Sequence, residues 1–112
     1  MIHRILSLLA VVLLLCACSK QSEIDRAANR MLDDARFALR YQHYSEARDT
    51  IFSLRKRFPT AIEARRQGIL LLDSIELMAA RDSLSKAEGP EWERLQVKAQ
   101  FYERKLQEDQ KK

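Results

Sequence analysis

The chain of 112 residues contains only two glycines and two prolines, which is few for its length. Aromatic residues are also sparse, at 7%. The sequence is instead rich in alanine, leucine, glutamate, lysine and arginine, which favour helices over strands. This length accommodates one small domain. The composition therefore predicts an all-α fold.

Cysteine and histidine are equally scarce, with two of each. Cys16 and Cys18 are separated by one residue, which is a poor spacing for a structural disulfide, and there is no other cysteine to pair with. His3 and His43 lie far from any thiol spacing of the zinc type. We therefore expect no structural disulfide, no metal and no cofactor.

The sequence also lacks a nucleophile–base pair and a phosphate-binding loop. Asp33 and Asp34 are a pair of carboxylates, but adjacent positions on a helix do not face each other. We therefore expect no catalytic residues, and an enzyme is the class of protein that these features favour least.

Residues 1–18 have the form of a secretory signal peptide. Arg4 gives a positive start, and Ile5 to Leu15 is apolar apart from Ser7. Eleven residues make a helix of about 16 Å, which is too short for a hydrocarbon core of roughly 30 Å. The segment indicates export from the cytoplasm.

The end of this segment, Leu15-Cys16-Ala17-Cys18, resembles the lipobox of bacterial lipoproteins. That family has a leucine three residues before the modified cysteine and a small residue just before it. Leu15 and Ala17 fit these places for Cys18, whereas Cys16 follows Leu15, a poor fit. The resemblance implies that residues 1–17 are removed and that Cys18 carries the lipid. The alternative is a plain signal peptide, or a membrane anchor with incidental cysteines.

The resemblance also bears on location. A residue other than aspartate after the lipidated cysteine generally permits transfer to the outer membrane, and Ser19 stands there. We therefore expect a lipid-anchored protein at the periplasmic face of the bacterial outer membrane. Residues 18–23 are then a short polar tether, and residues 24–110 form the domain.

Two helices are expected next. The first spans about residues 22–42, is capped by Ser22 and has a thin apolar stripe that permits close packing: Ile24, Ala28, Met31, Ala35 and Ala38. The second precedes Pro59, which ends it, and its stripe consists of Tyr44, Ala47, Ile51, Leu54 and Phe58. The small Ala47 should be buried where the two helices cross.

Residues 28–61 resemble one tetratricopeptide repeat, since the second helix has that family's spacing in Tyr44, Ala47, Ile51, Leu54 and Pro59. In the first helix, Asp34 departs from the pattern, because a leucine is expected there. The next 34 residues fit badly: Gly68 is one place early, and Arg81 stands where a small alanine belongs. The resemblance implies antiparallel helix hairpins that bind another protein.

Two more helices follow, giving about four after the signal peptide. The third starts with the capping box Thr60–Glu63 and runs to about Glu88, with Met78 as core filler. The fourth starts at Pro90 and carries a coiled-coil type seam: Trp92, Leu95, Ala99, Tyr102 and Leu106. This seam should cover Leu77, Ala80 and Leu84 of the third helix in a long hairpin, with Trp92 against Leu84. The alternative is pairing with another chain.

Basic residues surround the Pro59 turn: Arg55, Lys56, Arg57, Arg65 and Arg66. They either complement a helix C-terminus and face water, or contact acidic lipid or an acidic partner. Together with Trp92 they are the candidate interaction residues. The leading hypothesis is an outer-membrane lipoprotein that binds an unknown protein, and the alternative is a structural envelope protein that forms homo-oligomers. Nucleic-acid binding is suggested only by the pI of about 9.3, and export argues against it.

Overall fold

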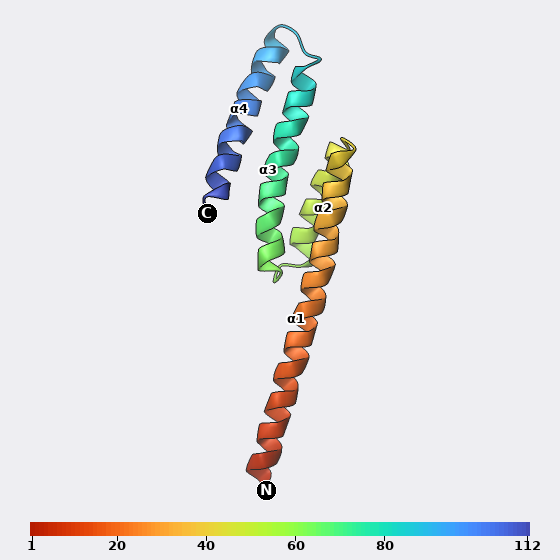
Figure 1. Ribbon diagram of the computed structural model, residues 1–112, viewed down its shortest axis with the longest axis vertical. Helices are drawn as coiled ribbons and strands as arrows, with labels where there is room; N and C mark the ends of the chain where they lie inside the picture. Colours follow the sequence, from red (N-terminus) through yellow and green to blue (C-terminus); the bar gives the residue numbers. More distant parts are fainter.

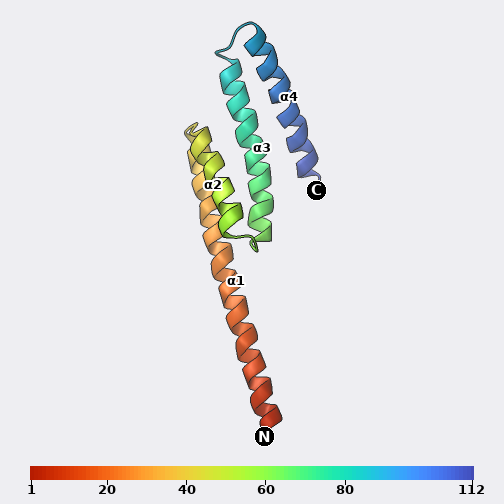
Figure 2. The same cartoon turned by 180° about the vertical axis from the view of Figure 1, so that it is seen from behind.

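The computed structural model describes residues 1–112, apart from the side chain of Ala17. It contains four helices: α1 (Ile2–Arg40), α2 (Tyr44–Arg57), α3 (Ile62–Leu84) and α4 (Pro90–Gln110). The described residues include no strand, which confirms the all-α prediction. Successive helices run antiparallel, and the N-terminal half of α1 projects alone beyond the other three (Figures 1 and 2). The molecule is therefore long and narrow, 80 × 26 × 17 Å.

Helix α1 is continuous for 39 residues, which differs from the prediction of a helix starting at Ser22. No glycine or proline occurs between Ile2 and Arg40, so neither of the two strongest helix breakers separates the apolar segment from the helix that follows it. Ser22 is an exposed interior position of α1, and the predicted N-cap is wrong. In this intact chain the segment expected to be a tether, residues 18–23, is also helical.

The main core lies between α1, α2 and the first half of α3. Ala47 is fully buried, as predicted, and so are Ile51 and Leu54 on the same helix. Leu32 of α1 is also buried, although the predicted stripe omitted it. The buried residues of α1 are mostly alanines, which lets α2 approach closely: Ala28, Leu32, Ala35, Ala38 and Leu39.

Gly68 marks a second close approach, where α3 crosses the α1–α2 pair. A Cβ atom at this position would lie 3.5 Å from Ile51 Cγ2 and 4.0 Å from Leu32 Cδ2. These are ordinary van der Waals distances, so α3 packs here against side chains from both neighbouring helices with room for one more methyl group.

The α3–α4 hairpin is confirmed, with a smaller core of its own. Leu77 and Ala80 of α3 pack with Ala99 of α4, and Tyr102 and Leu106 pack against this group. Leu95 is also buried. The seam predicted for α4 thus faces α3 in the same chain, except for Trp92, which is 40% exposed and, like Leu84, lies outside this core.

The two ends of α3 differ from the predictions. The capping box is wrong, because Ala61 is the N-cap and no side chain caps the helix. The helix also ends at Leu84 rather than Glu88, ahead of Gly89, whose φ is +65°. Near this end Met78 is 41% exposed, so its assignment to the core is wrong. Helix α3 extends beyond the α1–α2 turn (Figure 1), so one side of its last turns has no neighbour.

Candidate functional site

The exposed N-terminal arm of α1 is the most apolar part of the molecule. Every side chain from Ile2 to Leu15 is exposed. Helix α1 contains an 18-residue window with a mean hydropathy of 2.2, and none of this window is buried. By length and composition this window is long and apolar enough to cross a membrane. A signal sequence near an N-terminus meets the same test.

Cys18 is exposed at the junction between this arm and the body of the protein. One helical turn later, the Gln21 amide donates a hydrogen bond of 3.3 Å to the carbonyl oxygen of Thr60 in the α2–α3 turn. The same amide donates to Asp25 at 3.0 Å. Cys16 is exposed as well. Cys18 therefore lies at the base of the folded body, next to the α2–α3 turn.

The predicted basic cluster surrounds that turn. Arg55, Lys56 and Arg57 occupy the last turn of α2, where positive charge complements the helix dipole. On the other side, the Arg65 guanidinium donates to the carbonyl oxygen of Pro59 at 3.0 Å. Arg66 lies 3.8 Å from Glu63.

The members of this cluster differ in accessibility. Lys56, Arg57 and Arg66 are exposed, whereas Arg55 and Arg65 are half-buried. Trp92 belongs to a different region, the first turn of α4, where it is 40% exposed. The structure therefore does not bring Trp92 together with the basic cluster.

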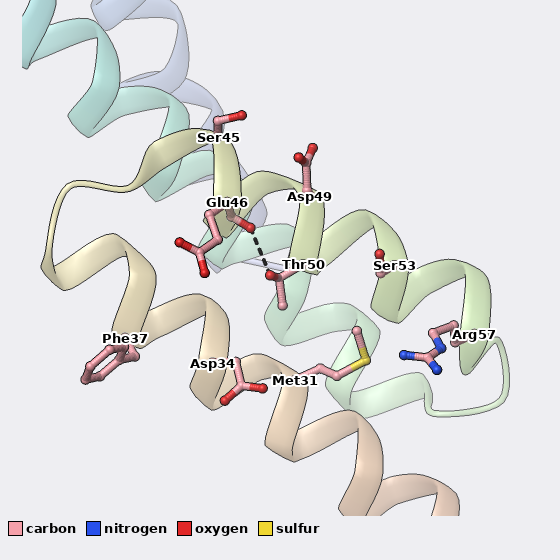
Figure 3. Close-up of a pocket in the computed structure, with 9 residues that line it drawn as sticks. All are labelled: Met31, Asp34, Phe37, Ser45, Glu46, Asp49, Thr50, Ser53 and Arg57. Carbon is pink, nitrogen blue, oxygen red and sulfur yellow. Dashed lines mark hydrogen bonds between the residues drawn. The ribbon is translucent and has the colours of Figure 1, made fainter.

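An open groove of about 800 Å³ runs between α1 and α2 (Figure 3). Three of its lining residues are acidic, namely Asp34, Glu46 and Asp49, and one is basic, Arg57. Glu46 lies 3.3 Å from His43, and its backbone carbonyl accepts a hydrogen bond of 2.8 Å from Thr50. Sequence reasoning missed this groove, because its two walls come from different helices and neither wall has a distinctive motif.

Aromatic side chains lie at the edge of the same groove. Phe37 lines it and is 59% exposed. Its ring centroid is 4.8 Å from that of Tyr41, which is also exposed. The groove therefore combines an acidic wall with an accessible aromatic surface.

Buried charges on α3 connect three helices. Asp73 is 2% exposed and accepts a hydrogen bond of 2.7 Å from Lys105 of α4, which also donates to Asp109. Glu76 pairs with Arg48 of α2. Sequence reasoning missed both acids, although a carboxylate inside the apolar run of α3 is a signal for a buried pair.

The environment shifts the pKa values of this group. Burial, followed by hydrogen bonding to Asp109, raises the pKa of Asp73. Hydrogen bonding to Asp73, followed by that to Lys105, lowers the pKa of Asp109 to about 2. Hydrogen bonds to Asp109 and Asp73 raise the pKa of Lys105. These charges hold α4 against α3.

Comparison with known protein families, curated proteins and solved structures finds no match for this chain. Among the described residues, no group of three or more histidine, cysteine, aspartate or glutamate side chains is arranged to hold a metal ion. The chain's own surfaces therefore supply the basis for a functional proposal.

Proposed function

We propose that this protein is a lipoprotein of the bacterial cell envelope, anchored through a lipid on Cys18 in the outer membrane and facing the periplasm. Its helical domain acts there as a tetratricopeptide-like module that binds another protein. The observation that carries the proposal is the position of Cys18. It follows an exposed apolar arm and precedes, by one helical turn, the first hydrogen bond between α1 and the α2–α3 turn.

The α1–α2 groove is the proposed binding face for the protein partner. Its acidic residues outnumber its basic ones by three to one, so it complements a segment with basic side chains. Phe37 offers an aromatic surface for an apolar side chain of the same segment. The partner that fits is thus a basic segment with an apolar anchor.

Metabolic labelling with a fatty acid tests the anchor. We predict that Cys18→Ser blocks both acylation and cleavage of the precursor, whereas the matched variant Cys16→Ser is labelled and cut like the parent chain. The reason is that a small residue, Ala17, precedes Cys18. Label retained in Cys18→Ser would contradict the proposed lipid site.

Photo-crosslinking in intact cells tests the binding face. A photoreactive phenylalanine in place of Phe37 should capture a protein, and Asp34→Asn with Asp49→Asn should weaken the capture. The same photoreactive group at Met78, exposed on α3, is the control. Equal capture from both positions would remove the groove from the proposal.

Self-association through α4 is a second candidate function. Val97 and Phe101 are 67% and 58% exposed. They lie one helical turn apart, on the side of α4 away from the buried Leu95 and Ala99. A second copy could cover this apolar pair, as in a structural envelope protein. The mass of the chain in solution distinguishes this candidate from the adaptor.

A further inference from the structure

We propose that residues 55–66, which are the α2–α3 turn and the basic helix ends on either side of it, dock on anionic phospholipid headgroups at the membrane surface. The turn then orients the body, so that the α3–α4 loop points away from the bilayer. This inference rests on membrane attachment through the N-terminal segment, which belongs to the proposed function. It goes further by assigning a binding role and a ligand class to the turn.

The hydrogen bond from Gln21 to Thr60 places the turn close to Cys18 along the molecule. Cys18 and Gln21 are three residues apart on a continuous helix, which is about 4.5 Å along its axis. The headgroup layer on each side of a bilayer is roughly 5–7 Å thick. A chain anchored at Cys18, or spanning the membrane through residues 2–18, therefore holds the turn at headgroup level.

The α2–α3 turn lies on the same side of the body as the N-terminal arm (Figure 1). The α2–α3 turn lies at the end of the body from which the N-terminal arm projects, and the α3–α4 loop lies at the opposite end (Figure 1). The 23 residues of α3 separate these two ends by about 35 Å. Only the first end can reach the headgroups.

Positive charge is concentrated at the end of the body that carries the α2–α3 turn. Residues 55–66, RKRFPTAIEARR, contain five basic side chains and one acidic one. At the opposite end, residues 81–94 contain three basic and four acidic side chains. Clusters of this size beside a membrane bind anionic lipids. Lys112 lines the same small cavity as Arg66, but it is paired there with Asp109 at 3.5 Å and adds no net charge.

An apolar side chain stands within the basic cluster. Ile62 is 77% exposed, next to Pro59 and Thr60, which are also exposed. A single exposed isoleucine is ordinary on a protein surface. At headgroup level, however, it can enter the boundary between headgroups and acyl chains while the flanking cations meet the phosphates.

Tryptophan fluorescence of the full chain in vesicles tests the docking. The chain has one native indole, Trp92 in the first turn of α4, and Trp92→Phe removes it. Ile62→Trp in that background then places an indole at the turn, where the site is open enough to accept it. The vesicles contain phosphatidylcholine with brominated acyl chains, with or without about a third of phosphatidylglycerol. The parent chain with Trp92 is the control.

We expect the indole introduced by Ile62→Trp to shift to shorter wavelength and to be quenched in vesicles with phosphatidylglycerol. High salt should reverse both effects, because it screens the attraction. Trp92 of the parent chain should show neither effect. Lys56→Gln with Arg66→Gln should weaken docking by roughly fivefold for each charge removed. The matched pair Arg40→Gln with Lys86→Gln, also exposed, should leave docking unchanged.

Three outcomes would overturn the inference. Equal quenching without phosphatidylglycerol removes the role of the charges. A chain that floats with the vesicles but shows no quenching at the turn leaves the anchor standing and rejects the docking. A chain that does not float with either kind of vesicle rejects both proposals. Hydrogen exchange of the backbone amides of residues 55–66 tests the docking in the unmodified chain, without a substitution. Docking must slow this exchange.

Discussion

Small side chains, rather than large ones, set the packing of α1 on α2. Ala28, Ala35 and Ala47 are all fully buried at this contact. Two helices whose facing residues are small approach more closely, and their backbones leave little room for extra atoms. Larger side chains at these positions should therefore destabilise the contact between α1 and α2.

Ala47→Leu tests this contact directly. The added atoms overpack a site that is fully buried, and we expect the free energy of unfolding to fall by about 1–3 kcal/mol. Chemical denaturation followed by circular dichroism measures the change. Ser45→Leu, at an exposed position on the same helix, is the control and should change stability little. A stable Ala47→Leu variant would mean that the two helices are not held at this spacing.

At Gly68, which is also buried, we predict that adding one methyl group stabilises the chain rather than destabilising it. A Cβ there meets Ile51 at 3.5 Å, an ordinary van der Waals distance, and alanine favours a helix interior over glycine by about 1 kcal/mol. Gly68→Ala should therefore stabilise the chain by up to about 1 kcal/mol, measured by the same denaturation. Gly68→Leu is the contrasting variant, which should destabilise. A loss of stability in Gly68→Ala would show that α3 lies closer to α2 than this geometry allows.

At the scale of elements, α4 is held by charges as well as by apolar contacts. The α3–α4 core is small, and the pair between Asp73 and Lys105 lies beside it. Breaking a buried pair is costly, because the remaining charge loses its partner. The docking of α4 should therefore depend on pH.

The pKa of Asp109 gives the direction in which stability changes with pH. Its pKa falls to about 2 in the folded chain, from an ordinary value of 3.8, because Asp73 and Lys105 favour the ionised form. Its stabilisation is thus complete above about pH 4 and is lost as the pH falls through about 2. Asp109→Asn lacks this stabilisation. We expect the difference in unfolding free energy between the two chains to be largest above pH 4 and to shrink towards pH 2.

Denaturation of both chains between pH 2 and 6 measures that difference. Comparing the two chains is essential, because Asp73 acts in the opposite direction. Its pKa is raised, so its ionisation costs stability as the pH increases. A constant difference across the range would mean that Asp109 does not contribute through its charge.

At the scale of the whole molecule, α4 offers two apolar faces with different roles. Leu95 is buried against α3, whereas Phe101 faces outward. The buried face holds the hairpin together, and the outward face is the only one of the two that another copy can reach. Substitutions on the two faces should therefore have different effects.

Leu95→Asp should lower the unfolding free energy by at least about 2 kcal/mol, because a buried leucine is replaced by a charge. It should leave the mass of the folded chain in solution unchanged. Phe101→Glu should leave the fold intact. Light scattering with a denaturation curve for each variant separates the cases. If Phe101→Glu converts an oligomer into a folded monomer, self-association through α4 replaces the adaptor proposal.

The sequence alone determined the all-α class, the approximate number of helices and most of the faces that pack. The four-residue and three-residue steps that contain Ala47, Ile51 and Leu54, and those that contain Leu95 and Ala99, report a buried helical face, because 3.6 residues make one turn. Pro59 and Gly89-Pro90 marked two of the turns for equally local reasons. The apolar arm and the cysteines that follow it are likewise visible in the order of the residues.

Tertiary structure alone decided how distant segments meet. No local pattern predicted the exposure of Met78, since that depends on where α1 and α2 end beside α3. The pairing of Asp73 with Lys105 and the acidic groove between α1 and α2 depend on how the helices are placed side by side. The same holds for the hydrogen bond from Gln21 to Thr60, across 39 positions. These contacts arise from packing between helices, and the spacing of residues within one helix carries no information about them.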